Sequence, residues 1–157
     1  MKPDSTLFEV LKRHGVPFVV VGGFAVVFHG HIRQTEDIDV VWVRNPQTEV
    51  ALSHALAEIG AEYIGKEIDP ATRIERTYPV TLGYIQTRPL MMLCTRSGFL
   101  DLFSYVPGFP EADVDAFYQE SVESAGIRYT SIEWLRKMKK AAGRLKDLED
   151  LEKLPPE

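Results

Sequence analysis

The segment from Val19 to Val41 restricts the possible folds of this chain more than any other. An apolar run there ends at Gly22 and Gly23, a stretch with helical character follows, and the chain then reaches Asp37 and Asp39. Glycines at the end of a strand allow a tight turn into a helix, and the apolar residues around the aspartates favour a second buried strand. This order of elements predicts an α/β fold.

Asp37 and Asp39 are the first candidates for a functional site. Residues two apart on a strand point to the same face, so their carboxylates are expected side by side, although their neighbours Ile38 and Val40 are suited to burial. Like charges at that separation repel, and a divalent cation such as Mg²⁺ or Mn²⁺ is the simplest compensation. A structural strand edge or a calcium site would also explain an Asp-x-Asp pair.

Gly22 and Gly23 lie at the predicted turn from strand to helix. Glycine there lets a phosphate approach the backbone N–H groups at the start of the helix. The same glycines could instead serve close packing between strand and helix. A phosphate-binding turn beside an acidic metal pair predicts chemistry on a nucleoside triphosphate.

The composition fits one small enzyme. With 157 residues and 45% hydrophobic content the chain can form one core, so we expect a single domain over residues 1–157. Cys94 has no partner for an internal disulfide and no secretory signal is recognisable, which favours the cytoplasm. The longest apolar run, Val16 to Phe28, is shorter than the roughly 20 residues of a membrane span. We therefore expect no membrane association.

Periodicity and turn residues predict alternating helices and strands along the rest of the chain. The expected helices cover residues 5–14, 23–30, 46–59, 114–120, 131–142 and, for a final turn or two, 147–154. The expected strands cover residues 19–21, 37–43, 73–78, 80–87, 90–95, 99–106 and 127–129. Thr130 and Glu133 have the spacing of a capping box at the start of the C-terminal basic helical segment, residues 131–154.

The chain resembles the DNA polymerase β-type nucleotidyltransferase superfamily in residues 19–41, V-V-V-G-G-F-A-V-V-F-H-G-H-I-R-Q-T-E-D-I-D-V-V. That superfamily has a strand, a Gly-Gly or Gly-Ser turn, a helix and an Asp-x-Asp strand. Residues 131–151, S-I-E-W-L-R-K-M-K-K-A-A-G-R-L-K-D-L-E-D-L, resemble a small bacterial branch that includes toxin-like stand-alone domains. The resemblance implies a mixed sheet flanked by helices.

The resemblance also implies roles for particular residues. In that superfamily a third acid on a neighbouring strand completes the metal site, and Asp101 occupies the matching place. Asp37 and Asp39 would hold two metal ions, while Asp101 would bind the second ion and help to deprotonate the attacking hydroxyl. Gly22 and Gly23 would present backbone N–H groups to the β- and γ-phosphates of the triphosphate.

Five further residues are candidates for binding nucleotide or phosphate. Arg33 and Thr35 lie in the loop before the Asp-x-Asp strand, where an arginine could reach phosphate or remain in solvent. Lys139, Arg144 and Lys146 belong to a basic stretch without acidic residues. That stretch could contact nucleotide or RNA phosphates, or it could be an exposed helix face.

The leading hypothesis is an enzyme that transfers a nucleoside monophosphate from an NTP to a hydroxyl and releases pyrophosphate. Its acceptor could be an RNA 3′ end, with a tRNA-directed toxin weakly favoured, a protein side chain, or a small molecule such as an antibiotic. One alternative is a catalytically weak or inactive module that binds nucleotide or a partner in a toxin–antitoxin pair. A metal-dependent glycosyltransferase is less consistent with the glycine turn. A phosphatase of the Asp-x-Asp-x-Thr type is excluded because Val41 occupies the threonine position.

Overall fold

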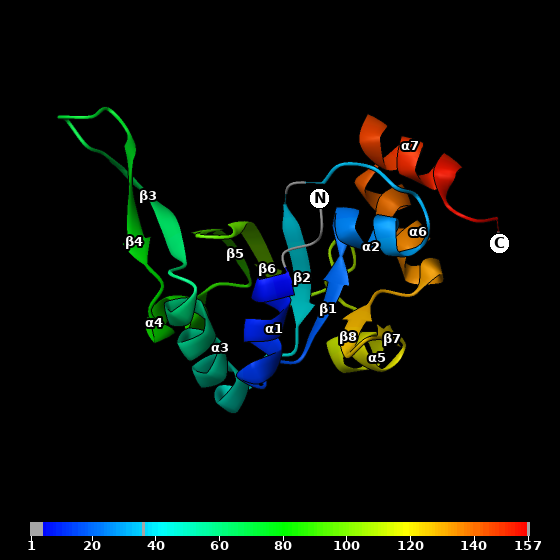
Figure 1. Ribbon diagram of the computed structural model, residues 1–157, viewed down its shortest axis with the longest axis horizontal. Helices are drawn as coiled ribbons and strands as arrows, with labels where there is room; N and C mark the ends of the chain where they lie inside the picture. Colours follow the sequence, from blue (N-terminus) through cyan, green and yellow to red (C-terminus); the bar gives the residue numbers. More distant parts are fainter. Residues whose placement is uncertain (1–4, 36, 157) are drawn as a thin grey trace.

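The computed structural model describes residues 5–35 and 37–156, and Figure 1 shows its helices and strands. The helices are α1 (Ser5–Arg13), α2 (Gly22–Phe28), α3 (Pro46–Glu58), α4 (Leu82–Thr87), α5 (Val114–Gln119), α6 (Ile132–Ala142) and α7 (Leu145–Lys153). The strands are β1 (Phe18–Val21), β2 (Ile38–Trp42), β3 (Glu62–Ile68), β4 (Glu75–Pro79), β5 (Leu90–Thr95), β6 (Gly98–Phe103), β7 (Val122–Ser124) and β8 (Ile127–Tyr129).

The strands form an 8-stranded sheet in the order β4-β3-β5-β6-β2-β1-β8-β7. The pairs β2–β6 and β1–β8 are parallel, whereas the other neighbours are antiparallel. The predicted mixed sheet with flanking helices is thereby confirmed. Figure 1 shows the β3–β4 ribbon projecting from one end of the molecule, with α6 and α7 at the other end.

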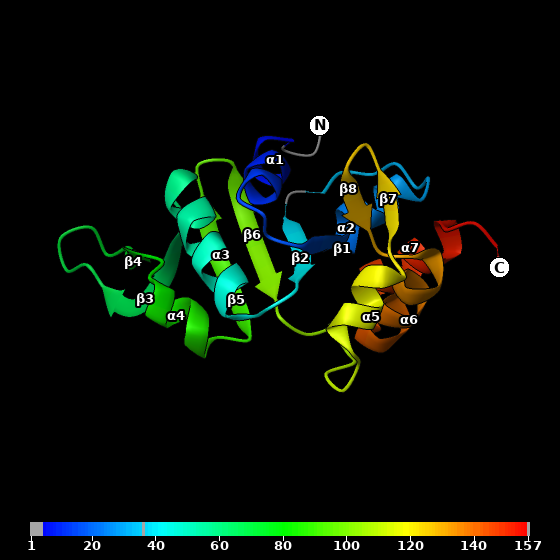
Figure 2. The same cartoon turned by 90° about the horizontal axis from the view of Figure 1, so that it is seen from below.

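One face of the sheet carries the larger hydrophobic core. Val40 and Leu102 are fully buried on this face and belong to the same cluster as Leu56 of α3. Figure 2 shows α3 packed over this side of the sheet. Because successive strand residues point to opposite faces, Asp39 and Asp101 are turned away from this core.

The opposite face of the sheet is covered over only part of its width. Val21 of β1 packs there with Phe117 of α5 and Met138 of α6. Farther along the sheet, Met92 of β5 and Phe99 of β6 are 63% and 55% exposed. The face that carries the aspartates is therefore covered by helices on one side and open on the other.

The middle of the chain contains two differences from the sequence prediction. The prediction of a strand over residues 80–87 is wrong. The Thr81 side chain accepts a hydrogen bond from Tyr84 N, and helix α4 starts there instead. Strand β3 was not predicted. Its residues are mostly exposed or only half-buried, so it lacks the apolar alternation by which a strand is recognised.

The start of α6 also differs from the prediction. The capping residue is Ser131, whose side chain accepts a 3.2 Å hydrogen bond from Trp134 N. Thr130 is fully buried, and its backbone N–H extends the pairing between β8 and β1 by donating to Val20 O. The Thr130 hydroxyl is buried and has no hydrogen-bond partner among the described residues, so Thr130 does not cap the helix.

Within the described part of the chain, every helix is too short or too polar to cross a membrane.

Candidate active site

Strand register brings two of the predicted acidic residues together. Asp39 in β2 is the register partner of Asp101 in the parallel strand β6 and of Val21 in the antiparallel strand β1. Register partners point to the same face of a sheet, so the two carboxyls lie side by side. Asp37 lies one residue before β2 and is exposed at the edge of the same region.

The Asp39 and Asp101 carboxyls lie close enough for each to change the pKa of the other. Burial raises the pKa of Asp39 to about 7, helped by the charge and hydrogen bond of Asp101 and by the charge of Asp37, and opposed by Lys139. Burial also raises the pKa of Asp101. Burial thus disfavours the ionised form of both carboxyls, and positive charge between them would be favourable.

Gly22 is required by both its conformation and its neighbours. Its φ of +68° lies in the left-handed region that side chains other than glycine's rarely adopt. A Cβ at this position would overlap Asp39 Oδ2 and lie 3.1 Å from Asp39 Cγ. The turn therefore lies directly against the Asp39 carboxyl.

The absence of a side chain at Gly23 allows the loop that follows α2 to pack closely against it. A Cβ here would overlap the Thr35 hydroxyl and lie 3.3 Å from a terminal nitrogen of Arg33. Both of these loop side chains thus lie against the glycine turn. The sequence predicted each of them as a phosphate contact, and the structure places both beside Gly23.

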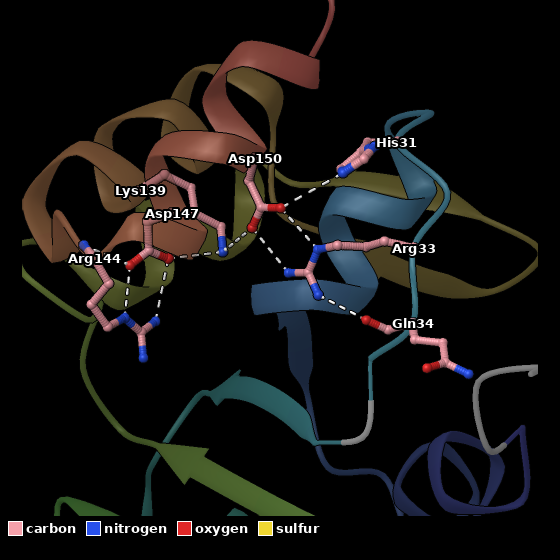
Figure 3. Close-up of polar contacts among 7 residues, drawn as sticks. All are labelled: His31, Arg33, Gln34, Lys139, Arg144, Asp147 and Asp150. Atoms are coloured by element: carbon pink, nitrogen blue, oxygen red, sulfur yellow. Dashed lines mark hydrogen bonds and ion pairs between the residues drawn. The ribbon is translucent and has the colours of Figure 1, made fainter.

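Lys139 is the centre of a buried ion-pair network, drawn in Figure 3. Its side chain projects from α6 and the residue is only 5% exposed. The Lys139 Nζ lies 3.2 Å from Asp147 Oδ1 and 2.9 Å from Asp150 Oδ2, both on α7. Asp150 in turn accepts two hydrogen bonds from Arg33, one from Nε at 2.8 Å and one from a terminal guanidinium nitrogen at 2.9 Å.

Arg144 and Lys146 lie at the start of α7. Arg144 Nε is 2.7 Å from Asp147 Oδ2, while 69% of the Arg144 side chain remains exposed. Asp147 raises the pKa of Arg144, with a smaller contribution from Asp39. The basic stretch is thus partly neutralised by the acidic residues that follow it, which was not expected from its composition.

All of the sequence-predicted site residues line one cleft of about 550 Å³. The predicted members of its lining are Gly22, Gly23, Arg33, Thr35, Asp37, Asp39, Asp101, Lys139, Arg144 and Lys146. The remaining lining includes Gln34, Phe103, Leu135, Met138 and Asp147.

Asp147 and Asp150 were not predicted from the sequence. Both are almost fully buried, and their signal was their spacing of three residues, which puts two carboxylates on the same side of a helix. A basic stretch followed by such a pair could have indicated an ion-pair network.

The carboxyls of Asp39 and Asp101 in the cleft fit a divalent cation that is shared with a substrate. Among the residues that the structure describes, no group of three carboxylate, histidine or cysteine side chains could hold an ion by itself. Mg²⁺, however, is usually bound by one or two carboxylates together with substrate phosphates and water. Asp39 and Asp101, which are paired in register on neighbouring strands, supply such carboxylates.

Comparison with solved structures supports the fold. The lincomycin-bound lincosamide antibiotic adenylyltransferase LnuA is 19% identical, with a TM-score of 0.60 over 96% of this chain and 94% of that one. ANT(2'')-Ia in complex with adenylyl-2''-tobramycin is 17% identical, with a TM-score of 0.53 over 94% and 83%. A putative nucleotidyltransferase from Thermotoga maritima is 16% identical, with a TM-score of 0.53 over 95% and 88%.

A search of curated proteins gives no match. The family model for aminoglycoside-2''-adenylyltransferase, in contrast, matches residues 5–154. The match includes the glycine turn, the Asp-x-Asp strand, Asp101 and both C-terminal helices, and the resemblance to the polymerase β-type superfamily is confirmed. The chain is a nucleotidyltransferase and belongs to the aminoglycoside-2''-adenylyltransferase family.

Proposed function

We propose that this enzyme transfers an adenylyl group from ATP, in a divalent-metal-dependent reaction, to a hydroxyl of a small molecule that carries amino groups. The observation that carries the proposal is the pairing of Asp39 and Asp101 on neighbouring parallel strands, next to the Gly22 turn. Two adjacent carboxyls whose pKa values are both raised by burial are suited to hold a cation when a substrate brings it.

The residues of the cleft divide the work of such a reaction. Asp39 and Asp101, with Asp37 at the edge, would hold the metal, and the metal would supply stabilisation of negative charge on the phosphates. The turn at Gly22 and Gly23 would direct backbone N–H groups to the terminal phosphates. The Asp101 carboxylate would accept the proton of the acceptor hydroxyl as its oxygen attacks the α-phosphorus and the bond to pyrophosphate breaks.

The acceptor would bind on the open part of the sheet face. Met92 of β5 is the register partner of Asp101 of β6. Phe99 of β6 is the register partner of Cys94 of β5, and Cys94 also pairs with Glu62 of β3. This face therefore combines exposed apolar surface with the carboxylate of Glu62, two strands away from Asp101. Apolar surface with an acidic group suits a compact acceptor with amino groups, the class to which tobramycin belongs.

An RNA acceptor is less well supported by the contacts. Lys139, which the sequence suggested as a phosphate contact, is buried and bound to Asp147 and Asp150. Its charge is therefore already compensated, and a polyanion gains little from it. Nothing in the described residues favours a tRNA or an antitoxin as a partner.

A label-transfer assay tests the proposal. The protein is incubated with Mg²⁺ and each of the four α-labelled NTPs, together with tobramycin, lincomycin, total RNA or total protein. We expect label from ATP to appear on a small molecule and to disappear when EDTA is added. Transfer to RNA or protein alone would contradict the proposed acceptor, and transfer in EDTA would contradict metal dependence.

Replacing Met92 by alanine tests the position of the acceptor. We expect KM for the small-molecule acceptor to rise about 10-fold, since loss of apolar contact in such a site costs roughly 1–3 kcal/mol, while KM for ATP stays unchanged. The matched control is Ile68→Ala, because Ile68 is similarly exposed at 60%, against 63% for Met92, but lies at the far end of β3. Equal effects of the two substitutions would show that the acceptor binds elsewhere.

A further inference from the structure

Arg33 is held from one side and remains available on the other. Its Nε and one terminal nitrogen donate to the two oxygens of Asp150, and the second terminal nitrogen donates to Gln34 O at 3.0 Å. Figure 3 shows this arrangement between the loop after α2 and helix α7. Each terminal nitrogen carries two N–H groups, so one on each remains without a partner among the described residues.

The held guanidinium lines the cleft beside the glycine turn to which the proposed function assigns the triphosphate. Arg33 lines the cleft, and the terminal nitrogen bound to Asp150 is the atom closest to Gly23 within its side chain. A planar guanidinium binds phosphate oxygens in a defined direction, so its orientation matters more than that of a flexible ammonium group. Without Asp150, rotation of the long Arg33 side chain would remove this orientation.

Stability alone does not account for Asp150. Burial on its own would raise its pKa, but hydrogen bonds from Arg33 and Lys139 outweigh burial and leave the pKa below its usual value. Asp150 is therefore a buried, ionised carboxylate. Such networks are often no more stabilising than well-packed apolar residues of similar volume, so a network beside a cleft indicates a positional role.

We propose that Asp150 is a positioning residue for the nucleoside triphosphate, since it holds the Arg33 guanidinium against the Gly23 turn with N–H groups directed to phosphate oxygens. The inference rests on the proposed function. It makes the C-terminal helix α7 a part of the nucleotide site, although Asp150 itself does not contact the nucleotide.

Equilibrium titration with Mg²⁺ and a non-hydrolysable ATP analogue tests the inference without turnover. Wild type is compared with Asp150→Asn, Arg33→Met and the double variant, and each protein is also melted. We expect either single substitution to weaken Kd about 10-fold, the loss expected for a charge-assisted contact, and the double variant to bind no more weakly than Arg33→Met. The matched control is Glu149→Gln, the same change at an exposed neighbour on α7, and it should bind as wild type does.

The possible outcomes separate this inference from the proposed function. If wild type does not bind the analogue, the proposed function fails. If wild type binds and Asp150→Asn binds equally well, or if the two effects multiply in the double variant, Asp150 does not act through Arg33. If Asp150→Asn does not fold, Arg33→Lys decides, because lysine keeps the ion pair but not the planar guanidinium. An unchanged Tm with a Kd weakened about 10-fold supports the inference, and an unchanged Kd overturns it.

Discussion

Asp39→Asn is expected to lower kcat by at least about 10³-fold and to melt at a higher temperature than wild type in EDTA at pH 8. The loss of rate follows because a catalytic metal ion contributes several kcal/mol to the transition state, and about 1.4 kcal/mol corresponds to a factor of ten. The gain in stability follows because burial disfavours an ionised Asp39 carboxylate beside Asp101, as its raised pKa shows, and asparagine has no charge to bury.

The gain in stability should depend on pH with a definite sign. The pKa of Asp39 is about 7 in the folded protein and about 3.9 in an unfolded chain, so the folded state binds more protons between these values. The free energy of unfolding therefore falls as pH rises from about 4 to about 7 and stays low above that. Asparagine does not titrate, so the Tm of the variant should exceed that of wild type by more at pH 8 than at pH 5.

Asp37→Asn provides the control for this prediction. It removes the same charge from the same site, but Asp37 is exposed, so we expect a loss of activity with a smaller change in Tm. Thermal melts at both pH values and steady-state rates with saturating Mg²⁺ and ATP give the comparison. A stability gain for Asp39→Asn that is equal at pH 5 and pH 8 would show that Asp39 is not protonated in the metal-free protein.

The parts of the site that the sequence predicted are local in the chain. Gly22, Gly23 and Asp39 fall within one strand–turn–helix–strand unit, and the order of residue types in such a unit is readable without knowledge of the tertiary structure. Asp101 was found only through the family resemblance. Its proximity to Asp39 depends on the parallel pairing of β6 with β2, which no local pattern encodes.

The parts that the sequence could not predict depend on long-range charge pairing. Lys139 has the sequence context of an exposed basic face, yet it is buried because α7 returns two carboxylates to it. Likewise, Arg33 could be read as a solvated loop residue or a phosphate ligand, and only the tertiary structure shows that Asp150 holds it. Charge counted along the sequence does not give the charge that a substrate meets in the cleft.

The β3–β4 ribbon was difficult to predict for a different reason. Residues of β3 are mostly exposed or half-buried. They form a strand because they pair with β5 and β4, and not because they bury an apolar face. The segment of α4 has a β-prone composition but forms a helix. The hydrogen bond from Tyr84 N to the Thr81 side chain caps the start of this helix. Tertiary pairing and local capping thus outweighed intrinsic propensity in this region.

Gly22→Ala is expected to reduce kcat by about 100-fold or more, because the new methyl group would displace the Asp39 carboxyl. A misplacement of about 1 Å in a catalytic group can cost about 10² in rate, and a Cβ at Gly22 overlaps Asp39 Oδ2. The variant should also lose stability, since a left-handed backbone costs a residue with a side chain roughly 1–2 kcal/mol.

Gly15→Ala separates the two effects, because Gly15 has a similar φ of +77° with nothing within 4 Å of an added Cβ. We expect Gly15→Ala to lower Tm while kcat stays near that of wild type. If both alanine variants lose stability equally and both keep kcat, the contact between the glycine turn and Asp39 has no catalytic importance, and Gly22 serves the backbone conformation alone.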